Sequence, residues 1–236
     1  MLLSEIFDSL RHGELGHMYM GGKEIDGIAA EDWPAIVSHI NLGLSALHKR
    51  FPLKYDEVII QQFEEIQTYY LRKQYALTNS NSNELIKYIM DSEYQPFKEN
   101  VIKIETVYSE FGEERPINDN NDNRSVFTPQ FDAIIKPYNC KENAMSVVYR
   151  ANHDKIIVTD DFNPDAIEVH LPITLIEPLL FFVANRVLNG MGAGNNIQEA
   201  NHYLSKYELA CAQIETYGLM NKEAASNIRL EKSGWV

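Results

Sequence analysis

Apolar residues recur at helical spacing near both ends of the chain. Between residues 33 and 50 they occupy every third or fourth position, at Trp33, Ile36, Val37, Ile40, Leu44 and Leu47. This period is typical of an amphipathic helix, and Pro34 lies in its first turn, where proline is tolerated. The Phe51-Pro52 pair ends the pattern, because proline disfavours helical backbone in the residue before it. A shorter helix is predicted over residues 4–10.

Two further helices are predicted towards the C-terminus. Residues 173–189 place Ile176, Leu180, Val183 and Val187 on one face. Residues 197–218 carry an apolar seam with alternating steps of three and four, at Ile197, Ala200, Leu204, Tyr207, Cys211, Ile214 and Gly218. Such a seam favours antiparallel packing against a neighbouring helix. The glycine-rich link at residues 190–194 is short enough to fold the two into a helical hairpin.

The middle of the chain has a different pattern of apolar and polar residues. Short β-branched or aromatic runs alternate with proline, glycine, asparagine and aspartate, at residues 58–60, 66–71, 101–108, 126–135, 145–150, 155–158 and 167–171. This pattern indicates strands separated by turns, although residues 83–90 also suit a helical turn and residues 118–123 suit an exposed loop tip. The predicted class is α+β. Residues 1–53 and 172–221 form a helical bundle, residues 54–171 an inserted β-rich module, and residues 222–236 an extended C-terminal tail.

Charge and composition narrow the function. The 236 residues include 34 acidic and 21 basic side chains, for a net charge of −13. This excess argues against a protein that grips a phosphate backbone, yet it suits a surface that nucleic acid passes without sticking. The most apolar window, residues 171–188, contains Pro172, Glu177, Pro178 and Arg186, so no membrane span is expected. An acidic N-terminus argues against a signal peptide, and an intracellular, soluble protein is expected.

Histidines and cysteines offer little chemistry. His12 and His17 flank a glutamate, but they lie five residues apart among glycines and not one helical turn apart as in a metalloprotease helix. Cys140 and Cys211 are far apart, which disfavours a disulfide framework or zinc site. Cys140 with His153 or His170 is the only conceivable Cys/His pair, and nothing in the sequence orients it.

Acidic and glycine clusters are equally inconclusive. Residues 118–123 resemble the start of a calcium loop, but Arg124 and Gln130 occupy the positions that need glycine and glutamate. Asp160, Asp161 and Asp165 suit either a hard cation or a turn. The glycines at residues 190–194 follow a helix and not a strand, so a phosphate cradle has no context. No catalytic residue, metal ligand or cofactor is predicted.

Two parts of the chain together resemble a known family. The first is the stretch from Asp32 to Phe51, DWPAIVSHINLGLSALHKRF. The second begins at Leu171-Pro172 and includes LLFFVANR at residues 179–186 and NHYLSKYE at residues 201–208. In order and texture these segments resemble the head-to-tail adaptor proteins of short-tailed bacteriophages, also called connector or tail-tubular proteins.

The resemblance implies a structural virion protein that is made in the host cytoplasm and assembled into the neck of the particle. It implies a homo-oligomeric ring, usually of twelve copies, beneath the portal protein and around the path of the viral DNA. Residues 173–189 and 197–218 would build the wall, the β module would face tail proteins such as a nozzle, hub or fibre, and the C-terminal tail would dock on the portal. The family implies no catalytic residue and no membrane.

Particular side chains fit these roles. Tyr203, Leu209 and Tyr217 fall outside the apolar seam, where they either meet a neighbouring subunit or pack on the protein's own β module. The tail contains the candidate portal-docking residues Ile228, Arg229, Leu230, Trp235 and Val236. Two alternatives remain open, which are an interaction module of another assembly and a metal-dependent hydrolase that uses Asp160, Asp161 and a histidine.

Overall fold

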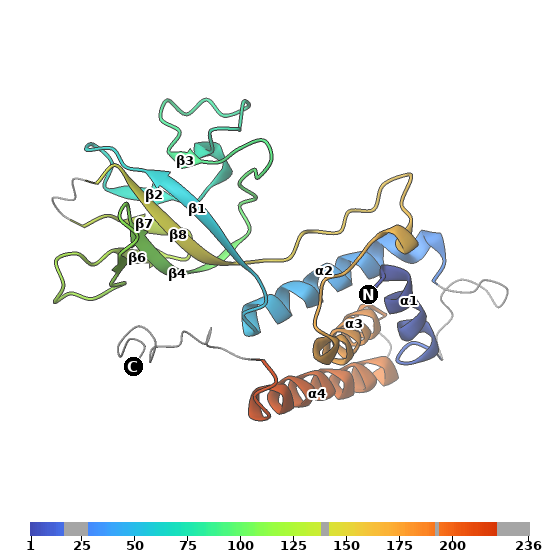
Figure 1. Cartoon of the computed structure of the whole chain (residues 1–236). Helices are drawn as coiled ribbons and strands as arrows, with labels where there is room; N and C mark the ends of the chain where they lie inside the picture. The colour runs from blue at the N-terminus through green and yellow to red at the C-terminus, as the bar shows by residue number, and fades with distance from the viewer. Residues whose placement is uncertain (17–27, 138–141, 192–193, 221–236) are drawn as a thin grey trace, which may run out of the picture. The chain divides into compact units, whose positions relative to one another are not determined.

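The computed structural model describes residues 1–16, 28–137, 142–191 and 194–220. These residues form four α-helices and two antiparallel β-sheets, which confirms the α+β class (Figure 1). The chain divides into two compact units. One combines Met1–Phe51 with Lys155–Val236 and contains the helices, and the other is Pro52–Asp154 and contains the sheets.

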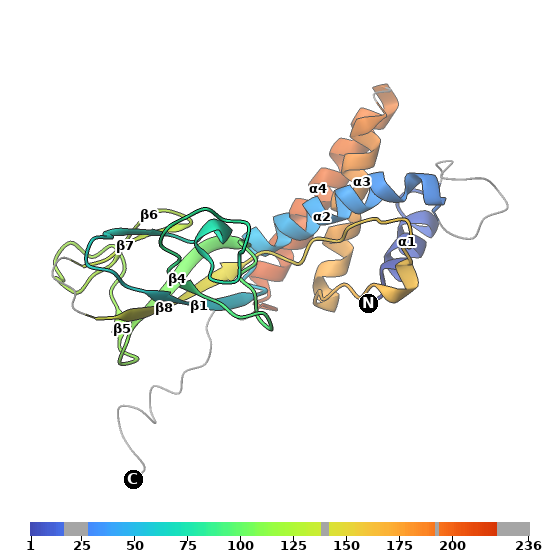
Figure 2. The same ribbon diagram turned by 90° about the horizontal axis from the view of Figure 1, so that it is seen from above.

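The helical unit contains α1 (Leu3–His12), α2 (Trp33–Arg50), α3 (Ile176–Gly190) and α4 (Gly194–Thr216). Helix α3 packs against each of the other three, and α3 and α4 lie side by side along much of their length (Figure 2). Helices α2 and α3 approach closely at Gly43, because a Cβ atom there would lie 2.7 Å from Leu179 Cδ1 and 3.0 Å from Phe182 Cδ1. The four helices predicted from apolar periodicity are therefore present.

The buried face of α4 is rotated slightly from the predicted seam. Ala200, Tyr207, Cys211 and Ile214 are buried as expected, whereas Ile197 and Leu204 are 44% and 43% exposed. Tyr203 takes the inner position in place of Leu204. Its ring lies 6.1 Å from that of Phe181, and its hydroxyl donates to the Glu14 carbonyl at 3.1 Å. An aromatic ring with a polar tip can fill such a half-buried position better than leucine.

Residues 155–171 differ from the prediction. They contain no named strand and belong to the helical unit, not to the β module. Their backbone pairs with the start of α1, since Leu3 donates to the Ile167 carbonyl at 2.9 Å and Val169 donates to the Met1 carbonyl at 2.8 Å. The Asn41 side chain also brackets Ile156, accepting from its N–H at 3.0 Å and donating to its carbonyl at 2.8 Å. These hydrogen bonds give backbone N–H and C=O groups of the extended segment partners outside the two sheets.

The β unit contains a five-stranded and a three-stranded sheet. The larger has the order β3-β1-β8-β4-β5, with bounds Ile89–Met90, Tyr55–Gln61, Ala144–Ala151, Val101–Ser109 and Glu114–Arg115. The smaller has the order β2-β7-β6, with bounds Thr68–Tyr70, Ala133–Ile135 and Phe127–Gln130. One core joins the two sheets, with Val58, Ile60 and Val147 from the larger and Tyr69 and Ile134 from the smaller.

Two predictions within the β module need correction, one of a strand and one of a helical turn. The single strand predicted over residues 126–135 is a hairpin, β6 and β7, with its turn at Phe131 and Asp132. Asp132 is buried and accepts from Arg72 Nε at 2.9 Å, an ion pair that the local pattern does not reveal. The helical turn considered at residues 83–90 is absent, and only Ile89–Met90 of that stretch is regular, as β3.

Candidate functional site

Two of the three predicted subunit-contact residues are exposed, Leu209 on α4 and Tyr217 in the turn that directly follows it. Leu209 is 60% exposed and Tyr217 is 70% exposed, so both leave large apolar area in solvent. Tyr203 is different, because its contacts with Phe181 and Glu14 use it inside the helical unit. Tyr203 is half-buried in the helical unit by these contacts, and its part in a contact between copies stays a prediction.

An ion-pair network fixes the C-terminal half of α4. Arg50, the last residue of α2, donates from Nε and Nη2 to the two carboxylate oxygens of Glu215 at 2.9 and 3.3 Å, and from Nη1 to Glu208 at 2.7 Å. The hydrogen bond to Glu215 is the main reason that the pKa of Arg50 is raised. Both glutamates lie on one face of α4 because they are seven residues apart. We define this trio as the Arg50 clamp.

A buried thiol lies near the Arg50 clamp. Cys211 lies between the two glutamates in sequence and is fully buried. Burial raises its pKa to about 11, which keeps the thiol protonated at neutral pH. A thiol of this kind is a poor nucleophile, so Cys211 serves packing. Sequence reasoning placed Cys211 in the seam but missed the clamp, whose signal was the seven-residue spacing of Glu208 and Glu215.

The chain ends outside the described residues. Ile228, Arg229, Leu230, Trp235 and Val236, the predicted portal-docking residues, all belong to the stretch that the structure does not describe. Their role stays a prediction. The last described helical residues, in contrast, are anchored by the Arg50 clamp at Glu215, so the point from which the tail continues is fixed on the helical unit.

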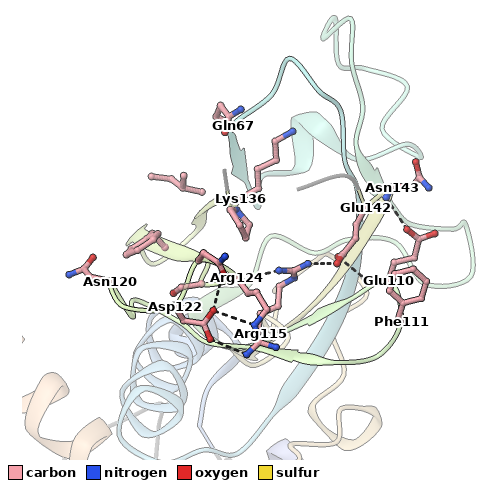
Figure 3. A pocket seen from close by; sticks show the side chains of 15 residues that line it. Gln67, Glu110, Phe111, Arg115, Asn120, Asp122, Arg124, Lys136, Glu142 and Asn143 are labelled. Carbon is pink, nitrogen blue, oxygen red and sulfur yellow. Dashed lines mark hydrogen bonds and ion pairs between the residues drawn. The ribbon is translucent and has the colours of Figure 1, made fainter. Parts of the chain in front are cut away.

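The β unit contains a broad open cavity with a volume of about 1240 Å³ (Figure 3). Charged side chains of both signs line it, namely Glu110, Arg115, Asp122, Arg124, Lys136 and Glu142. In Figure 3, the Arg115 side chain points toward Glu142, and the Arg124 side chain points toward Asp122.

Each of these charged groups already has a partner. Arg115 pairs with Glu142, and Arg124 pairs with Asp122 at 3.0 Å, which lowers the pKa of that carboxyl. Glu110 accepts from the Asn143 N–H at 2.9 Å, and the buried Lys136 ammonium donates to the Phe63 carbonyl. The arrangement braces loops around the cavity. Among the described lining residues no side chain is poised as a nucleophile with an adjacent base, which is the geometry that covalent catalysis requires.

The candidate metal ligands are not assembled. Within the described stretches, no three His, Cys, Asp or Glu side chains lie close enough to hold an ion. Asp160, Asp161 and Asp165 are exposed, and the Asp165 N–H is capped by the Asn163 side chain at 3.0 Å, as in a turn. Asp119 and Asp122 likewise accept from the N–H two residues on, at 2.8 Å each.

The candidate histidine and cysteine pairs each include a residue that the structure does not describe. His153 Nδ1 lies 2.9 Å from the Asp154 carbonyl, and His170 Nδ1 lies 3.8 Å from a Glu168 carboxylate. Cys140 and His17 lie outside the described residues.

One helix meets the length and composition of a membrane span. The window Ile173–Gly190 has a mean hydropathy of 1.2 despite the interruptions seen in the sequence, and half of it is buried within the structure. The expectation that no stretch of the sequence would be apolar enough for a membrane span was therefore wrong as a statement about composition. Burial of Leu179, Val183 and Val187 against other helices accounts for the apolar character by core packing.

Comparison with known proteins adds no relative. The chain matches no protein-family model and no curated protein sequence.

Proposed function

We propose that this protein is a structural head-to-tail adaptor of a short-tailed bacteriophage. In this proposal the helices form a bundle, copies of the bundle join into a homo-oligomeric ring of about twelve beneath the portal protein, and the β unit faces the tail proteins. The extended tail, residues 222–236, docks on the portal. The protein acts by assembly in the virion and catalyses no reaction.

The supporting observation is the way the chain is divided. Helices from both ends, α1 and α2 with α3 and α4, come together in one unit, and the intervening residues 52–154 form a separate β unit. A ring-forming bundle with an inserted module requires this division. The exposed Leu209 on α4 and Tyr217 just after it leave apolar surface that a neighbouring copy can bury.

Charge supports a channel role. The net charge of −13 gives a surface that repels phosphate, so DNA can pass without the contacts that would slow it. The Arg50 clamp supports a docking role for the tail, because it holds the end of α4, from which the tail continues, in place. A segment that orders on binding can engage a groove or a sheet edge in this way.

Co-assembly with portal rings of the same virus tests the proposal. The full chain should co-sediment with the portal, and a chain that ends at residue 221 should keep its circular dichroism spectrum and thermal transition but no longer co-sediment. Co-sedimentation of the truncated chain at the level of the full chain would show that the tail does not dock.

The ring contact has its own test. Leu209→Glu with Tyr217→Glu should leave folding intact, because both side chains are exposed, yet should prevent ring formation on the portal by placing charge in an apolar contact. Ser205→Glu, also at an exposed α4 position, is the matched control for added charge on that helix. Rings of normal size from the double variant would refute the α4 contact.

A further inference from the structure

The hydrogen-bond ladder of β1 alternates strictly between its two sides. Strand β8 pairs with β1 along its whole length, in the register Tyr55↔Arg150 to Gln61↔Ala144. Just beyond the two ends, Ala151 donates to the Lys54 carbonyl at 2.9 Å and Gln62 donates to the Asn143 carbonyl at 2.7 Å. Even-numbered residues of β1 therefore direct their backbone N–H and C=O groups to β8, and odd-numbered residues direct theirs to the opposite edge.

Strand β3 covers only part of that opposite edge. Gln61 donates to the Tyr88 carbonyl at 2.8 Å, and Ile59 pairs with Met90. Continued in this register, Glu57 would face Ser92. The Ser92 N–H instead makes a weak bond to the Gln95 carbonyl at 3.4 Å, because the chain turns away there. Among the described residues no strand pairs with the outer edge of β1 at Tyr55 and Glu57.

A groove runs beside this open edge. It has a volume of about 580 Å³ and lies wholly within the β unit. Asp56, Glu57 and Ile59 line one wall, and Met90, Pro96 and Phe97 line the other. The groove lies on the side of β1 from which the chain turns away at Ser92, so an extended segment can enter beside Tyr55 and Glu57. Ile59 and Met90, at 49% and 44% exposed, offer apolar contact on the outer face.

The charge of the groove selects among extended segments. Two lysines, Lys54 and Lys98, stand against four carboxylates, those of Asp56, Glu57, Asp91 and Asp154. Both lysines contact Asp154, Lys54 at 3.5 Å and Lys98 at 2.9 Å. Asp56 accepts from the Asn100 amide at 3.2 Å, and Glu57 accepts from the Ser146 hydroxyl. Lys54 Nζ also lies 3.7 Å from an Asp56 carboxylate oxygen, so Asp56 has a cationic partner. The bond from the neutral Ser146 hydroxyl leaves the negative charge of Glu57 in place.

We propose that the free edge of β1 binds an extended, basic segment of a partner protein, which adds to the sheet as a strand beside Tyr55 and Glu57. Backbone pairing would supply the affinity, while lysine or arginine side chains beside Glu57 on the outer face and apolar side chains beside Phe97 on the core face would supply the selectivity. This inference concerns the β unit alone and does not depend on the proposed ring or on portal docking.

Binding of short peptides to the full chain tests the proposal. The probe is an acetylated nine-residue peptide of alternating lysine and valine, compared by fluorescence anisotropy with a glutamate–valine peptide and with a backbone N-methylated lysine–valine peptide. Only the first should bind in a saturable manner. Equal binding of the acidic or N-methylated peptide, or saturable binding by none of the three, would overturn the proposal.

Hydrogen exchange locates the binding site. In the free chain the amides of Tyr55 and Glu57 should exchange quickly while those of Asp56 and Val58 are protected by β8. The lysine–valine peptide should slow exchange at Tyr55 and Glu57 by about tenfold or more. If these two amides are already protected in the free chain, the chain itself covers the edge and the partner proposal is wrong.

Two substitutions at Glu57 separate backbone pairing from charge. Glu57→Pro removes one outward N–H without removing a bond to β8, because proline is tolerated at a free strand edge. It should weaken peptide binding about fivefold to tenfold, the equivalent of about one hydrogen bond. Glu57→Gln keeps the N–H and should weaken binding less. Unchanged affinity in a folded Glu57→Pro variant would overturn the proposal, and the exchange pattern of the unaltered chain decides the case if that variant does not fold.

Discussion

Replacing Arg50 by alanine removes the clamp that joins the end of α2 to the C-terminal half of α4. The guanidinium makes a two-oxygen contact with Glu215 and a single contact with Glu208. Its loss removes these hydrogen bonds from both glutamates on α4. Because Glu215 is next to the last helical residue, Thr216, the final turn of α4 should fray, and the residues that follow should lose their fixed starting point.

The cost follows from the exposure of the three side chains. Arg50 is 25% exposed, Glu215 37% and Glu208 59%. Hydrogen bonds to charged groups contribute about 1.5–3 kcal/mol when shielded, and exposed ion pairs contribute about 0–1 kcal/mol. We assign about 1 kcal/mol to the Glu215 contact and about 0.5 kcal/mol to the Glu208 contact on this scale. The sum of about 1.5 kcal/mol should lower the Tm of the helical unit by about 3–6 °C.

Thermal unfolding of Arg50→Ala, Glu215→Gln and the double variant measures this coupling directly. The cycle should return a coupling energy near 1 kcal/mol, since the residues touch. Arg50→Lys should fall between wild type and Arg50→Ala, because an ammonium cannot make the two-oxygen contact. Lys103→Ala, which breaks an exposed pair with Glu105, is a control that should change little. A coupling energy near zero for Arg50 and Glu215 would refute the clamp.

Two further outcomes are expected. Gly43→Leu should destabilise the helical unit by about 2 kcal/mol or more, because the leucine side chain meets Leu179 and Phe182. Gly43→Ala should stay within about 1 kcal/mol of wild type, since the gain in helix propensity offsets a contact that flexible side chains can relieve. Equal unfolding free energies for both variants would contradict the close contact between α2 and α3. The Cys211 pKa is raised from 9.0 to about 11, so the unfolded chain releases this proton first and stability should fall as pH rises from about 9 through 11. Peptide-resolved alkylation at pH 8 should accordingly be slow at Cys211 in the native protein and fast in denaturant, and equal rates would show that the thiol is accessible.

The helices were predictable because each contains apolar residues at helical spacing over several turns, which outweighs single residues that do not fit the pattern. The exact face of α4 was not. Leu204 continues the heptad pattern as well as Tyr203, and only the contacts of Tyr203 with Phe181 and Glu14 decide between them. Those partners lie 22 and 189 residues away in sequence, a separation that periodicity does not address.

The strands were predictable as β-rich segments but not as partners. Residues 167–171 have strand composition, yet the backbone at Ile167 and Val169 bonds to the start of α1. The hairpin of β6 and β7 was hidden because Asp132, a polar residue in an apolar run, is satisfied by the distant Arg72. Similarly, the open edge of β1 depends on where β3 turns away, which is a property of the Ser92–Gln95 turn.

Electron microscopy of the neck of the intact particle, with this chain traced in the density, tests the central claim most directly. If the protein is a head-to-tail adaptor, the density should show a closed ring of identical copies beneath the portal, with Leu209 and Tyr217 at the contact between neighbours and residues 222–236 seated on portal subunits. A neck whose density excludes this chain, or a ring in which those final residues make no contact with the portal, would contradict it.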